Sequence, residues 1–139
     1  MLKTWLAIGG FLLSFSAEAK DPIWINVGTS DHAKISIDAA NVRFLTARVI
    51  QAWVLFDLTA PEQGPDGRMY QSQKQLTRFD CSSDRYALVS MASYPAAAGA
   101  GSPVQNWDSS DAPLSFMHTI PGSVMDAVMS VVCNLKQPR

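Results

Sequence analysis

The chain has 139 residues, of which 47% are hydrophobic, and eleven Lys and Arg face twelve Asp and Glu. This near balance of charge excludes the basic footprint typical of proteins that bind nucleic acid or an anionic membrane surface. The length fits one domain with its own core and is too short for two.

The first nineteen residues have the plan of a secretory signal peptide. Lys3 supplies the positive region, residues 5–15 supply an apolar run, and Ala17-Glu18-Ala19 is a small-x-small cleavage signature. The apolar run is shorter than the ~20 residues of a membrane-spanning helix, and no cysteine at its end marks a lipid-attachment site. We therefore expect cleavage between Ala19 and Lys20, which leaves an exported domain at residues 20–139.

The first half of this domain reads as strands. Short runs at 23–27 and 33–38 are separated by turn residues at 28–32, and residues 39–45 fit either a short strand or a helical turn. The run at 48–58 is apolar on both faces and rich in β-branched and aromatic residues. A buried helix is the alternative, but the composition favours a central strand covered on both sides.

A polar strand follows a predicted turn at residues 60–67, which contains two prolines and two glycines. Successive residues of 68–79 point to opposite faces of the predicted strand, and both faces carry polar side chains. Both faces are therefore expected to be partly exposed to water. An edge position is the simpler explanation, and exposure at a groove or partner surface is the alternative. The strand delivers Cys81, the first of only two cysteines.

The next segments are a turn, a strand and a long connection. Residues 80–84 lack the twelve-residue acidic spacing of a calcium loop, and residues 85–94 form a strand pattern. The small-residue stretch at 95–103 lacks the glycine pattern and context of a phosphate-binding loop. Residues 104–117 are expected to form a loop that packs back through Trp107 and Phe116.

The chain closes with a predicted amphipathic helix. Ser123 is its expected N-cap, and Asp126 lies in the first turn, where a carboxylate suits the helix dipole. The helical spacing places Val124, Ala127, Val128 and Val131 in one apolar stripe, widened by Met125, Met129 and Val132. Such a helix must be buried against the sheet.

The two cysteines, Cys81 and Cys133, are expected to form a disulfide, because exported proteins meet an oxidising environment. The alternative is a catalytic thiol that uses His32 or His118 as its base. Closing the long loop between Cys81 and Cys133 stabilises the fold by roughly 4 kcal/mol. The predicted fold is α+β, with a single antiparallel sheet of about six strands and a C-terminal α-helix packed on it and tethered by the disulfide.

The order of these features resembles the surface-adhesin protein E family over nearly all of residues 20–139. The matching segments are Ile35-Ser36-Ile37-Asp38, residues 49–57 around Trp53, Tyr70-Gln71-Ser72-Gln73-Lys74, Phe79-Asp80-Cys81, residues 94–101, Pro121-Gly122-Ser123 and Val132-Cys133. The resemblance implies a small exported bacterial domain that binds host matrix or serum proteins, such as vitronectin, laminin and plasminogen, and that can form homodimers. The family's best-known members resemble anchored lipoproteins, whereas this signal peptide lacks the anchoring cysteine, and no family binding motif falls on particular residues.

Three functions follow from these features, and none requires a cofactor or a metal. The leading hypothesis is a non-enzymatic exported binding domain of the adhesin-E type. The second is a soluble periplasmic ligand-binding or accessory protein with no adhesive role. The third is a small hydrolase that uses Asp80 or Asp84 as a base, although His32 and His118 lie in predicted loops without a catalytic or zinc-binding motif.

Overall fold

The computed structural model describes residues 19–109 and 111–137. The predicted signal peptide therefore lies outside the described residues, apart from Ala19. A single antiparallel sheet carries six strands in the order β1-β2-β4-β5-β6-β7, while β3 pairs with β4 and β8 with β6. The strands are β1 Trp24–Thr29, β2 Ala33–Asp38, β3 Arg43–Phe44, β4 Val49–Gln63, β5 Met69–Asp80, β6 Arg85–Tyr94, β7 Gln105–Asp108 and β8 Met117–His118. The helices are the 3-10 turn η1 (Ala97–Gly99) and α1 (Val124–Cys133).

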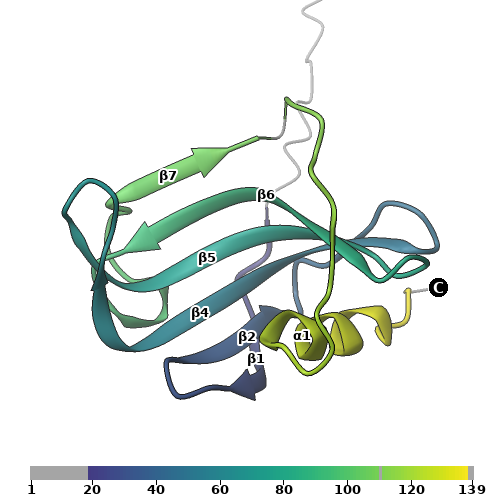
Figure 1. The fold of residues 1–139 in the computed structure, drawn as a ribbon, viewed down its shortest axis with the longest axis horizontal. Coiled ribbons are helices and arrows are strands. Elements are labelled where there is room, and N and C mark those ends of the chain that lie inside the picture. Colours follow the sequence, from purple (N-terminus) through teal and green to yellow (C-terminus); the bar gives the residue numbers. More distant parts are fainter. Residues whose placement is uncertain (1–18, 110, 138–139) are drawn as a thin grey trace, which may run out of the picture.

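The helix α1 covers one part of one face of the sheet, where it contacts β1, β4 and β5 (Figure 1). We call this the helix face and the opposite side the open face. The core between helix and sheet combines apolar side chains from β2, β4, β5 and α1: Ala33, Ile35, Ile37, Ile50, Ala52, Val54, Phe79, Val128, Met129 and Val132. Their burial provides the main driving force for packing the two layers.

The helix begins and ends as its sequence predicts. The Ser123 hydroxyl accepts a hydrogen bond from the Asp126 amide at 3.2 Å, as an N-cap does. At the other end, Cys133 is joined to Cys81 by a disulfide. Cys81 directly follows β5, so the bridge ties the end of the helix to the end of an internal strand of the sheet. The predicted fold class and its disulfide tether are confirmed.

The buried face of the helix differs from the predicted apolar stripe. Val124 is 37% exposed and Ala127 is also exposed, whereas Val128, Met129 and Val132 are buried. The apolar residues run almost all round this helix, so spacing alone does not decide which of them face the sheet. No helix among the described residues is long and apolar enough to cross a membrane.

Three other predictions are corrected by the structure. The predicted turns are shorter than expected, because β1 continues through Gly28 to Thr29 and β4 continues to Gln63. The predicted loop at 104–117 contains β7, and its last residue, Met117, begins β8. Most importantly, the polar strand β5 is not an edge: it pairs with β4 on one side and β6 on the other.

Candidate functional site

The open face carries a groove of about 840 Å³. Its floor contains Trp53 from β4 and Leu76 from β5, which lie directly opposite each other in the sheet. Trp24 from β1 and Tyr94 from β6 also line it, as does Lys74 from β5. Ala19, Lys20, Pro22 and residues 40–43 contribute to its rim. We call this feature the open-face groove.

Strand register explains why these residues meet. Side chains directly opposite each other in neighbouring strands lie on the same face. Ile35 and Ile37 of β2 point into the helix-side core, so Asp38 lies on the open face, and Trp24 is paired with Asp38. Trp53 and Leu76 continue this face across β4 and β5.

Lys74 is held between two aromatic rings. Its Nζ lies 5.8 Å from the centre of the Trp24 ring and 5.0 Å from the centre of the Tyr94 ring. Both contacts fall within the range of a cation–π interaction. The rings come from β1 and β6, so the lysine on β5 connects strands that are not neighbours in the sheet.

The turn η1 and its flanking residues form a wall beside Lys74. The buried Ser72 hydroxyl donates to the Ala96 carbonyl at 2.6 Å and accepts from the Gly99 amide at 2.8 Å. The Asp57 carboxylate accepts from the Ala98 amide at 3.0 Å. A methyl group at Gly99 would collide with Cε of Lys74. The glycine is therefore what allows this wall to close over the lysine.

The opposite rim is built around the carboxylate of Asp38, which is 3% exposed. Its oxygens accept hydrogen bonds from the Ile23 amide, the Ala40 amide and the Asn41 side chain, at 3.0, 3.0 and 2.6 Å. Asn41 also bonds both backbone groups of Lys20: its Oδ1 accepts from the Lys20 nitrogen at 3.0 Å, and its Nδ2 donates to the Lys20 carbonyl at 2.9 Å. The segment that follows the predicted cleavage site is thus fixed along the groove.

The groove has the composition of a binding site. Its volume lies within the range of ~300–1,000 Å³ typical of ligand sites, and such sites combine aromatic walls with a few polar groups. The only carboxylate among its described lining residues is Asp38, whose oxygens are already engaged. Gln51, which also lines the groove, accepts two hydrogen bonds from the Arg78 guanidinium. The groove thus offers aromatic surface and the Lys74 charge with which a ligand could be bound.

The residues considered for chemistry lie elsewhere. The disulfide uses both cysteines, so neither is available as a thiol nucleophile. His32 lies in the exposed turn before β2 and His118 in exposed β8, and neither lines the groove. Within the described residues, no three His, Cys, Asp or Glu side chains are arranged to hold a metal ion.

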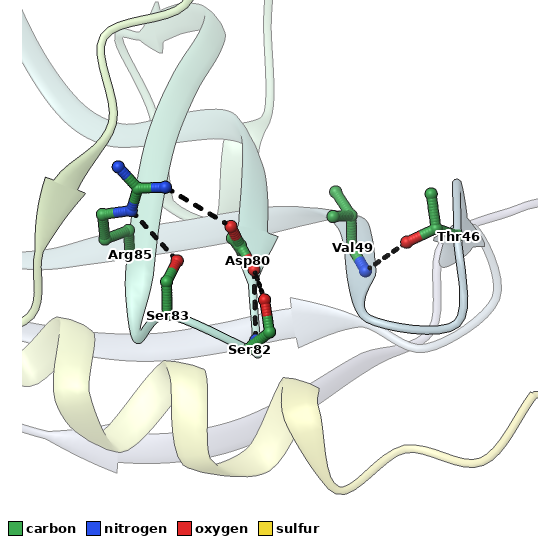
Figure 2. A network of polar contacts seen from close by, with 6 residues as sticks. All are labelled: Thr46, Val49, Asp80, Ser82, Ser83 and Arg85. Atoms are coloured by element: carbon green, nitrogen blue, oxygen red, sulfur yellow. Dashed lines mark hydrogen bonds and ion pairs between the residues drawn. The ribbon is translucent and has the colours of Figure 1, made fainter.

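Asp80 belongs to the turn between β5 and β6. Figure 2 shows Ser82 and Arg85 directed at its carboxylate, and Ser83 directed at Arg85. Hydrogen bonds from Ser82 and then Ser83 hold the pKa of the Asp80 carboxyl below its usual value, and the Arg85 charge adds to the effect. A lowered pKa makes a carboxylate a poor proton acceptor near neutral pH. Asp84 is exposed with a positive φ of 51°. Both aspartates therefore serve as turn residues, and nothing in their surroundings supports the hydrolase hypothesis.

Sequence reasoning anticipated part of this site. A groove was one of two explanations for the polar strand at 68–79, and β5 does supply Lys74 and Leu76 to the groove. The roles of Trp24 and Tyr94 were missed, because they depend on a register that spans five strands. The one available signal was an aromatic residue in each of three strands on the face opposite the core.

The fold is similar to that of two solved structures of protein E from Haemophilus influenzae. One, from the non-typeable bacterium, has a TM-score of 0.57 and 12% sequence identity, and the match covers 85% of this chain and 79% of that chain. The other has a TM-score of 0.55 and 11% identity, with 81% and 91% covered. No curated protein matches the sequence.

A family model gives the more specific result. The model described as surface-adhesin protein E matches residues 24–134, which include every strand and the helix up to the residue after Cys133. The match therefore spans the whole described fold rather than one motif. The chain belongs to the surface-adhesin protein E family.

Proposed function

We propose that this chain is an exported, non-enzymatic domain that binds a protein partner, with host matrix or serum proteins as the first candidates. The observation that carries the proposal is the family match across residues 24–134. In this proposal residues 1–19 are a signal peptide that is cleaved after Ala19, and residues 20–139 act in the periplasm or at the cell surface. The groove on the open face supports a binding role, because it offers aromatic surface and charge.

The location is tested by protease shaving of intact cells, with immunodetection of this protein and a periplasmic protein as the control. Digestion while the periplasmic control stays intact would support exposure at the surface. Protection until the outer membrane is opened would contradict an adhesive role. N-terminal sequencing of the recovered protein tests the cleavage site, since the proposed mature chain begins at Lys20.

Partner binding is tested with the purified mature domain on immobilised vitronectin, laminin and plasminogen. We expect saturable binding to at least one of them, and none by an unrelated exported domain of similar size. The reduced and alkylated domain is a second control, because loss of the Cys81–Cys133 tether should destabilise the fold by roughly 4 kcal/mol and so weaken any binding that needs the folded domain. Absence of binding to all three would overturn the choice of host partners.

A second candidate function is supported by the groove itself. A soluble periplasmic protein that binds a ligand or assists another protein would use an aromatic, partly enclosed site of this kind. Cell fractionation separates the two functions, because a purely periplasmic protein is released with the periplasmic fraction and resists shaving. A homodimer, as the family resemblance implies, would be detected by light scattering of the mature domain.

A further inference from the structure

The Lys74 ammonium has N–H donors that the described residues around it leave without a hydrogen-bond acceptor. Its contacts are with the faces of the Trp24 and Tyr94 rings. Across the described part of the chain, no hydrogen bond or ion pair engages its three N–H donors. A lysine that is partly buried and held in place by rings, without an anion, is prepared to receive one.

The rest of the groove reinforces this charge. Arg43, which pairs with Gln51, and Lys20 also line the groove. With Lys74 they outnumber the one carboxylate among the described lining residues, that of Asp38, which is bonded to three N–H groups of the rim itself. In the proposed mature chain, the Lys20 nitrogen at Asn41 becomes an α-ammonium and adds a further cation. Between Lys74 and Arg43 lie Trp53 and Leu76. The groove therefore complements an anionic ligand with an apolar middle.

The length of the groove indicates what kind of ligand fits. Its lining residues extend from Gln51, which pairs with Arg78, to Tyr94, which pairs with Ser72. Arg78 and Ser72 are six positions apart on β5, which is about 20 Å at ~3.3 Å per residue. An extended peptide of about six residues covers the same distance, whereas a compact small acid fills only one end.

The geometry points to the open-face groove as a docking site for an extended acidic and apolar peptide segment of a protein partner. Lys74 binds a carboxylate at one end, the aromatic side chains and Leu76 contact apolar side chains in the middle, and Arg43 with Lys20 attracts a second carboxylate. This inference rests on the proposed protein-binding function and names the part of the partner that this surface recognises.

The test uses three capped hexapeptides and the mature disulfide-bonded domain labelled with ¹⁵N. The first probe is Ac-Asp-Leu-Thr-Phe-Leu-Asp-NH2. The second replaces both Asp by Asn, and the third replaces Leu and Phe by Ser. We expect the first peptide to shift backbone signals around Lys74, Leu76 and Tyr94. Loss of both charges should weaken binding roughly ten- to a hundredfold, in keeping with hydrogen bonds to a charged group, and the serine peptide should bind more weakly than the first.

Two lysine variants locate the effect. Lys74→Gln should reduce the preference for Asp over Asn to that of the remaining cations. Lys34→Gln removes the same charge from an exposed residue of the same sheet face outside the groove, and it should keep the full preference. A Lys74→Gln variant that keeps the whole preference, or peptide-induced shifts that lie outside the groove, would overturn the inference. So would 3-phenylpropionate, a small apolar acid, if it bound as tightly as the first hexapeptide.

The same variants separate this inference from the proposed function. If Lys74→Gln abolishes binding to a full-length protein partner that Lys34→Gln still binds, both are supported. If both variants bind that partner equally, the groove is not its docking site, although the domain remains a protein-binding one. If the peptide binds in the groove but no matrix or serum protein does, the docking site stands and the choice of host partners fails.

Discussion

Two buried hydroxyl groups on β5 differ in one respect that decides their effect on stability. Ser72 is 0% exposed and makes hydrogen bonds with the backbone at Ala96 and Gly99. Thr77 is 1% exposed, and its Oγ1 has no hydrogen-bond partner among the described residues. Burying an unpaired hydroxyl costs free energy, whereas a paired one contributes to stability.

The two positions therefore predict opposite outcomes. Thr77→Val keeps the shape and removes the unpaired oxygen, so it should raise the free energy of unfolding by about 1 kcal/mol. Ser72→Ala leaves the Gly99 amide and the Ala96 carbonyl without this partner. This substitution should therefore lower the free energy of unfolding by about 1–2 kcal/mol. Urea unfolding of the two variants beside the unmodified protein measures both. A destabilised Thr77→Val protein would show that its hydroxyl has a partner in solution.

Asp80 predicts how stability depends on pH. Its pKa is lower in the folded protein than its usual value, so its contribution to stability is present above the unfolded pKa of ~3.9 and is lost as the pH falls through the folded pKa. We expect the unmodified protein to be more stable than Asp80→Asn at pH 6 and this difference to shrink below about pH 4. Unfolding curves at several pH values measure it, and Ser82→Ala should move the loss to higher pH. A constant difference down to pH 2 would contradict the assignment.

At the scale of elements, the groove depends on a turn that sequence patterns described as a linker. Residues 95–103 are small and lack a periodic pattern, so they indicated no particular structure. Their docking depends on Ser72 and Asp57, which belong to distant strands. Dependence on distant strands also explains why β7 and β8 were not predicted. These strands of four and two residues exist because β6 provides an edge for pairing, not because of their own composition.

The elements that sequence did predict have strong local signals. β2 and β6 match their predicted bounds, because alternation and turn residues define both. The helix start follows from Ser123, and the tether follows from two cysteines in a chain with a predicted signal peptide. The predicted edge position of β5 was wrong, because its polar side chains resemble those of an edge strand. They are polar because one face lines the groove and much of the other extends beyond the helix.

Gly99 offers a test of how the turn η1 shapes the groove. Its φ is +71°, so Gly99→Ala introduces a residue that rarely adopts this conformation, and the new methyl group collides with Lys74. Gly122 is a matched control, since its φ is +78° but nothing lies within 4 Å of an added Cβ. Backbone strain should cost either variant about 1–2 kcal/mol, but only Gly99→Ala should also displace Lys74. We expect weaker binding of the acidic hexapeptide by Gly99→Ala alone, and equal binding by both variants would argue against this role of the turn.

At the scale of the whole molecule, the domain has two layers, because the helix packs on only one face of the sheet. The helix covers β1, β4 and β5, while β6 and β7 extend beyond it (Figure 1). Residues of α1 and of the sheet contribute to the same core, so neither layer buries its apolar surface without the other. The disulfide is the covalent link between them, and closing its loop stabilises the fold by roughly 4 kcal/mol in the chain-entropy account.

This arrangement predicts that the disulfide supports the whole fold and not the helix alone. We expect reduction to lower the hydrogen-exchange protection of α1, β2, β4 and β5 by the same free energy, because they share one core and unfold together. The edge strand β7 should change little, since its amides exchange by local opening in either state. Native-state hydrogen exchange of the oxidised and reduced domains, compared with a Cys81→Ser/Cys133→Ser variant, makes the measurement. If only α1 lost protection, the helix would be a separable unit, and the sheet would not depend on the shared core for its stability.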